Sequence, residues 1–155
     1  MCYLVEVADR ANLKRYNLFM ARDLYHDSVR HALEKEGWKV TNDPLKIPVE
    51  DTNFLIDLGA ERLIAAEMGK ERIAVEIKVF GGVSLVTDFH LALGQVLNYS
   101  LILREVDPTR KLWLAVPTDT YQTFFHGRYP TRALLHIEVG MIVFDPISEV
   151  IVQWI

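Results

Sequence analysis

Charged side chains interrupt two apolar stretches of the sequence that are typical of buried strands. Asp57 lies between Ile56 and Leu58, and Glu76 and Lys78 lie within a run of aliphatic residues. Charged groups are rarely placed in apolar strands unless they are paired or functional. Successive side chains of a strand point to opposite faces, so Glu76 and Lys78 should share one face while the aliphatic residues fill the other. The pattern predicts a polar site on one face of a sheet.

Asp57, Glu76 and Lys78 are residue types that suit metal-dependent cleavage of a phosphodiester bond. Mg²⁺ takes oxygen ligands and binds proteins through one or two carboxylates plus water and phosphate. We expect Asp57 and Glu76 to supply those carboxylates, with Mg²⁺ or Mn²⁺ as the metal. The metal lowers the pKa of a bound water and neutralises charge on the phosphate. Lys78 would orient that water or stabilise the transition state.

Two simpler explanations of these charges stay open. Alternating charges in a strand often mark only a solvated face of a sheet. The three charges could also form a structural ion-pair ladder, in which Lys78 neutralises Asp57 and Glu76.

Two further polar residues follow on a helix and strengthen the catalytic interpretation. Gln95 and Tyr99 are four positions apart, so they share one helix face. There they could hydrogen-bond substrate phosphate or a metal-bound water, and we include both among the candidate catalytic residues. The alternative is an ordinary amphipathic helix with Tyr99 packed and Gln95 solvated.

His26, on the first convincing helix, is also included as a candidate catalytic residue. It shares a helix face with Val29 and Leu33. The alternative is therefore a partly buried histidine that makes a structural hydrogen bond.

The order D-x(18)-E-x-K, formed by Asp57, Glu76 and Lys78, resembles the core motif of the PD-(D/E)XK nuclease superfamily. Gln95 and Tyr99 match the Q-x-x-x-Y motif that follows it in RecB-like members. The resemblance implies that the two acidic residues bind a divalent metal and that the lysine lies beside the attacking water. Ile56 stands where that family's motif has proline.

The elements that would position these residues alternate between helices and strands along the chain. The predicted helices span 23–36, 87–105, 119–125 and 129–138. The predicted strands span 38–41, 54–58, 62–67, 71–80, 111–116, 141–144 and 149–154. The early strands are separated by short turns and predict an antiparallel meander, whereas the helix over 87–105 predicts a crossover to a parallel strand. We expect an α/β fold, a restriction-endonuclease-like sandwich with a mixed central β-sheet flanked by helices.

Length and composition indicate a single soluble domain. The chain has 155 residues, of which 50% are hydrophobic, but charged residues recur too often for a membrane span. We therefore expect a cytoplasmic protein with no membrane association. Cys2 is the single cysteine, which excludes an internal disulfide and a cysteine-based zinc site. The net charge of -4 is opposite to that of a simple nucleic-acid binder.

The first 19 residues fit the rest of the chain poorly. They show no sustained period, and Met20 provides a second plausible start before the first convincing helix. We expect residues 1–19 to be a flexible or loosely docked extension, or the result of a wrongly chosen start codon. The endonuclease-like domain would then span residues 20–155.

From Met20 onward the sequence resembles the XisH-type fdxN-element excision controlling factors. The stretches that carry the resemblance include ARDLYHDSVRHALEKEGW, IDLGAE, AVEIKVF, FHLALGQVLNY and LAVPTDTYQTFF. The resemblance implies an accessory role in programmed excision of a DNA element, with DNA and a small XisI-type protein as partners. Two hypotheses follow. The chain is either a Mg²⁺-dependent DNA endonuclease, for which a homodimer would suit the cutting of two strands, or a catalytically silent nuclease-fold protein that regulates a site-specific recombinase through protein partners.

Overall fold

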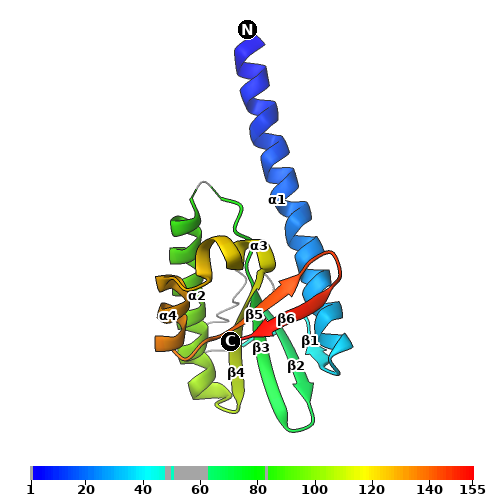
Figure 1. Cartoon of the computed structure of the whole chain (residues 1–155), viewed down its shortest axis with the longest axis vertical. Helices are drawn as coiled ribbons and strands as arrows, with labels where there is room; N and C mark the ends of the chain where they lie inside the picture. Colours follow the sequence, from blue (N-terminus) through cyan, green and yellow to red (C-terminus); the bar gives the residue numbers. More distant parts are fainter. Residues whose placement is uncertain (1, 48–49, 51–62, 83) are drawn as a thin grey trace.

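A six-stranded mixed β-sheet forms the centre of the computed structural model (Figure 1). The structure describes residues 2–47, 50, 63–82 and 84–155. The strands lie in the sheet in chain order; β3 pairs with β4 and β4 with β5 in parallel, and the other neighbours are antiparallel. The strands are β1 (Lys39–Asn42), β2 (Leu63–Met68), β3 (Glu71–Ile77), β4 (Arg110–Pro117), β5 (Gly140–Asp145) and β6 (Val150–Trp154). The predicted mixed sheet and the parallel crossover are confirmed.

Helices cover the two faces of this sheet. The C-terminal part of α1 (Cys2–Lys35) packs on one face, and its N-terminal part projects beyond the sheet, whereas α2 (Leu85–Val106) and α4 (Tyr129–His136) pack on the other face (Figure 1). The short α3 (Thr118–Thr120) continues directly into η1 (Tyr121–Phe125), a single π-helical turn. The fold is therefore α/β with a sheet flanked by helices. Within the described part of the chain, no helix is both long and apolar enough to span a bilayer.

Side chains of β3 alternate between two separate hydrophobic cores. Ile73, Val75 and Ile77 belong to the core beneath α1, whereas Ala74 belongs to the core beneath α2. On the neighbouring β4, Leu114 also lies in the core beneath α2. Both central strands are thus buried on two faces, which explains why their sequences are nearly continuous apolar runs.

The boundaries of α2 and of the end of α1 follow local sequence signals. The Ser84 side chain accepts a hydrogen bond from the Thr87 backbone N–H at 3.4 Å, so Ser84 is the N-cap that starts α2. Gly37 ends α1 with a φ of 94°, and the Trp38 N–H returns to the Leu33 carbonyl at 3.0 Å. This is the left-handed glycine stop that the sequence predicted.

Two boundaries differ from the prediction by more than two residues. α1 begins at Cys2, so the helix runs through most of the segment predicted to be an extension. No glycine or proline occurs between Cys2 and Glu36, and nothing in the local sequence therefore breaks the helix. β3 ends at Ile77 instead of continuing to Phe80. The strand predicted over 54–58 lies outside the described residues.

Candidate functional site

Glu76 and Lys78 lie at the carboxyl end of β3, inside the protein. Glu76 is 1% exposed and Lys78 is 6% exposed. The strand partners of Glu76 are Leu63 on β2 and Leu114 on β4. Since Leu114 lies in the core beneath α2, alternation along β3 places Glu76 on the same face. The prediction that Glu76 lies on the face opposite to Val75 and Ile77 is confirmed, but the face of Glu76 also packs, since Ala74 belongs to the core beneath α2.

Lys78 follows the last residue of β3 but remains attached to the sheet. Its backbone N–H donates to the Ala115 carbonyl of β4 at 3.2 Å, which continues the ladder by one residue. Two positions separate Lys78 from Glu76, so both side chains leave the backbone toward the α2 side.

Burial of these two residues excludes one of the simpler explanations. A solvated sheet face would leave both side chains in water, whereas both are almost completely enclosed. Burying a charge costs several kcal/mol unless compensating interactions are present. The chain therefore keeps two costly groups at one end of β3, as expected either of a functional site or of a structural ion pair.

α2 brings Gln95 and Tyr99 to this same side of the sheet. Tyr99 is 4% exposed and belongs to the core that also contains Leu114. Gln95 lies one helical turn earlier, and its Oε1 is buried with no hydrogen-bond partner among the residues that the structure describes. The alternative, in which the Gln95 amide is solvated, is therefore wrong for this oxygen. An amide oxygen is a hard ligand of the kind that Mg²⁺ prefers.

The predicted site residue Asp57 lies outside the described residues. β2 begins at Leu63, the strand partner of Glu76. Among residues 2–47, 50, 63–82 and 84–155, no group of three or more His, Cys, Asp or Glu side chains could hold a metal ion.

His26 lies on α1, on the face of the sheet opposite to α2. Its Nε2 is 2.9 Å from Asp43 Oδ1, and its Nδ1 is 3.3 Å from Asp27 Oδ1. Arg30 donates to the other oxygen of Asp43 at 2.8 Å. These contacts tie the loop after β1 to α1, as expected of a structural histidine. The structure does not bring His26 together with Glu76.

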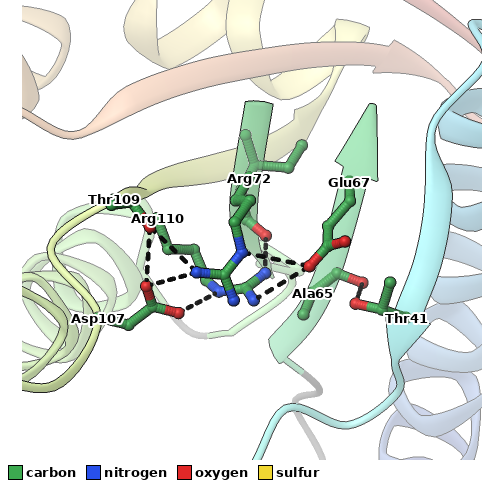
Figure 2. Close-up of polar contacts among 8 residues, drawn as sticks. Thr41, Ala65, Glu67, Arg72, Asp107, Thr109 and Arg110 are labelled. Carbon is green, nitrogen blue, oxygen red and sulfur yellow. Dashed lines mark hydrogen bonds and ion pairs between the residues drawn. The ribbon is translucent and has the colours of Figure 1, made fainter. Parts of the chain in front are cut away.

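A second polar cluster, which the sequence did not suggest, lies at the opposite end of β3 (Figure 2). Arg110 at the start of β4 is 7% exposed and donates to the Ile73 carbonyl and to Asp107, each at 3.0 Å. Arg72 on β3 donates to Asp107 at 2.7 Å and to Glu67 on β2 at 3.2 Å. Three strands and the end of α2 are therefore joined by one network.

This network changes the ionisation of Asp107. Burial acts to raise its pKa, but hydrogen bonds from Arg110 and Thr109 and the charge of Arg72 outweigh that effect and hold the pKa below its usual value. Arg72 and Arg110 are direct partners in the parallel pairing of β3 with β4. The network therefore helps to fix the register that places Glu76, four residues after Arg72, beside its neighbours on β4.

Comparisons with known proteins assign the chain to a family. The family model described as XisH protein matches residues 19–152. The crystal structure of an XisH family protein from Nostoc punctiforme PCC 73102 is 46% identical with a TM-score of 0.76, and the match covers 85% of this chain and 98% of that one. An fdxN element excision controlling factor protein from Anabaena variabilis is also 46% identical with a TM-score of 0.76, covering 86% and 98%. No curated protein matches the chain. The family match begins at residue 19, in agreement with the predicted limit of the resemblance, and the chain belongs to the XisH family.

Proposed function

We propose that this XisH-family protein hydrolyses phosphodiester bonds of DNA with a divalent metal, as an accessory factor in the excision of a DNA element. The observation that carries the proposal is the burial of Glu76 and Lys78 at the end of β3, on the side of the sheet that is covered by the helix carrying Gln95 and Tyr99. The sheet, its parallel crossover and these residues support a restriction-endonuclease-like fold of the PD-(D/E)XK type.

The residues at this site fit the requirements of Mg²⁺ or Mn²⁺. The Glu76 carboxylate and the buried Gln95 amide oxygen are hard oxygen donors, and Asp57 would supply the second carboxylate. A bound metal would provide an activated water and would neutralise charge on the phosphate. Lys78, enclosed by protein, would act on developing negative charge more strongly than a solvated lysine because the surrounding dielectric is low. Tyr99 and Gln95 would position the phosphate or the attacking water.

A second function is favoured by the charge of the chain. A net charge of -4 is unfavourable for binding the DNA backbone by the chain alone. The Anabaena variabilis relative is named as an excision controlling factor, which describes control and not cleavage. On this alternative the protein is catalytically silent and regulates a site-specific recombinase through protein partners. A small XisI-type protein is the partner expected in either case, and a homodimer is compatible with both.

The decisive experiment compares cleavage by the wild type and Glu76→Gln, which keeps the size of the side chain. Supercoiled, branched and single-stranded DNA would be incubated with Mg²⁺ or Mn²⁺, with and without a co-expressed XisI-type partner. We expect the wild type to nick or linearise at least one substrate and Glu76→Gln to be slower by about 100-fold or more. Glu105→Gln, on the exposed side of α2, is the matched control and should cleave like the wild type.

The folded state of each variant would be checked by circular dichroism and thermal unfolding. If the wild type cleaves none of the substrates under any of these conditions, the regulatory function replaces the enzymatic one. Equal cleavage by the wild type and a folded Glu76→Gln would exclude Glu76 as a metal ligand.

A further inference from the structure

A groove of about 600 Å³ opens on the face of the sheet beneath α1, near the end of β3 that is farther from Glu76. It lies between the end of α1, the turn that joins β2 to β3, and the strands β3, β4 and β6. Its volume is in the range of pockets that hold small molecules or one or two nucleotides. The site around Glu76 and this groove are therefore on opposite faces of one sheet.

All three tryptophans of the protein line this groove. The ring centroids of Trp113 and Trp154 are 4.7 Å apart with the planes at 87°, and those of Trp38 and Trp154 are 5.9 Å apart. Trp113 packs directly over Gly140 of β5, where an added Cβ would lie 2.4 Å from the ring. Gly140, the strand partner of Trp113, has no side chain and so leaves space for the indole ring to pack against the backbone of β5.

Trp113 has a polar atom without a partner in the described part of the chain and a cation beside its ring. The Nε1 of Trp113 is buried and has no hydrogen-bond partner among the described residues, although buried indole N–H groups usually find one. The Nζ of Lys111 lies 4.3 Å from the centroid of the same ring. By contrast, the Nε1 of Trp154 already donates to the Glu36 carboxylate at 3.3 Å.

The groove offers cationic groups to a ligand, although the protein as a whole is acidic. Three cations line it together with the two carboxylates of Glu36 and Glu71; Arg72 is paired with Glu67 and Asp107, and Glu36 accepts a hydrogen bond from Trp154. Lys70 and Lys111, which line the groove, are exposed to solvent. The three cations are Lys70, Arg72 and Lys111.

We propose that this groove binds single-stranded nucleic acid, with a base against the indoles of Trp113 and Trp154 and a phosphate at Lys111 and Lys70. Every nucleobase has a flat π-face that stacks on aromatic side chains, and its ring and exocyclic atoms include hydrogen-bond acceptors for an indole N–H. An acidic peptide would use the lysines but would leave the indole surface without a flat partner. The choice of nucleic acid as the ligand rests on the proposed DNA-related function. The groove would give the protein a contact with an unpaired strand that is separate from the site at Glu76.

The three tryptophans make the test direct, because all of the protein's tryptophan fluorescence comes from residues that line this groove. A ten-residue thymidine oligonucleotide would be titrated into the protein in EDTA, so that no cleavage takes place. We expect saturable quenching, weakened several-fold in Lys111→Gln, with a slope of log affinity against log salt that is smaller by about 0.7. Trp113→Phe, which keeps a ring but removes the N–H, should also bind several-fold more weakly. Arg132→Gln, which removes a charge from the exposed side of α4 on the other face of the sheet, should bind like the wild type.

Three results would overturn the proposal. One is the absence of quenching. Another is equal affinity for an abasic oligonucleotide or for polyglutamate, which would assign the groove to phosphate alone or to an acidic protein segment. The last is an unchanged affinity in folded Lys111→Gln. Because the titration needs neither metal nor Glu76, it can fail while cleavage succeeds, or succeed while cleavage fails, and the two proposals are tested separately.

Discussion

The network at the start of β4 predicts a stability loss that depends on pH. Replacing Asp107 by Asn keeps the shape of the side chain but removes the negative charge that faces the enclosed guanidinium of Arg110. A hydrogen bond to a charged group contributes about 1.5–3 kcal/mol, and the lower end applies because Asp107 is one quarter exposed. We therefore expect Asp107→Asn to lower the free energy of unfolding by about 1.5–2 kcal/mol at pH 7. For a chain of this length, that corresponds to a fall in Tm of about 3–8 °C.

The sign of the pH dependence follows from the lowered pKa of Asp107. A carboxyl group whose pKa is lower in the folded state stabilises the protein above its unfolded pKa, which is 3.8 here. That stabilisation is lost as the pH falls through the folded pKa, since the wild-type carboxyl then becomes neutral like the Asn side chain. The difference between the wild type and Asp107→Asn should therefore shrink as the pH is lowered from 7 to about 3.

Urea unfolding followed by circular dichroism at these two pH values would measure the difference. Asp23→Asn, at an exposed position of α1, is the matched control and should be neutral at both. A double-mutant cycle with Arg110→Met would isolate the coupling between the two side chains. A loss below about 0.5 kcal/mol at pH 7, within the usual range of surface substitutions, or an equal loss at both pH values, would refute the reasoning.

Three further predictions concern the metal, one packing contact and one helix end. Calorimetric titration of Mn²⁺ should give binding heat with the wild type and with Glu105→Gln but not with Glu76→Gln; equal heats in all three would exclude Glu76 as a ligand. Gly140→Ala should lower the free energy of unfolding by about 1–3 kcal/mol in urea, because the new methyl would overlap the ring of Trp113; a neutral result would show that the ring can move. Gly37→Ala should cost about 1 kcal/mol in the same assay, since φ is 94° there although space is available; no loss would mean that the helix end relaxes without penalty.

The features that the sequence predicted well are those encoded within one element. Alternation along β3 predicted that Glu76 and Lys78 share a face, and helical spacing predicted that Gln95 and Tyr99 lie together on α2. Ser84 and Gly37 marked helix ends because capping depends on the nearest few residues. Each of these features depends on residues that lie close together in the sequence, within one or two helical turns or a few positions of one strand.

The features that the sequence did not predict depend on segments far apart in the chain. The network of Arg72, Asp107 and Arg110 exists because parallel pairing brings the starts of β3 and β4 together across a 22-residue helix. The three tryptophans of the groove come from three separate parts of the chain, and each tryptophan alone is typical of a core. His26 was assigned to the site from its residue type and its place on the first helix, but α1 lies on the opposite face of the sheet, where His26 makes the structural contacts of the alternative explanation.

Neighbouring residues of β4 connect the two faces of the sheet. Trp113 lines the groove, and Leu114, the next residue, is the strand partner of Glu76. The carbonyl of Ala115 also accepts the hydrogen bond from Lys78. A ligand that displaces β4 when it fills the groove would therefore move the neighbours of Glu76 and Lys78 as well. Thermodynamic linkage then requires reciprocity: a metal ion at Glu76 would change the affinity of the groove by the same factor by which the groove ligand changes the affinity for the metal.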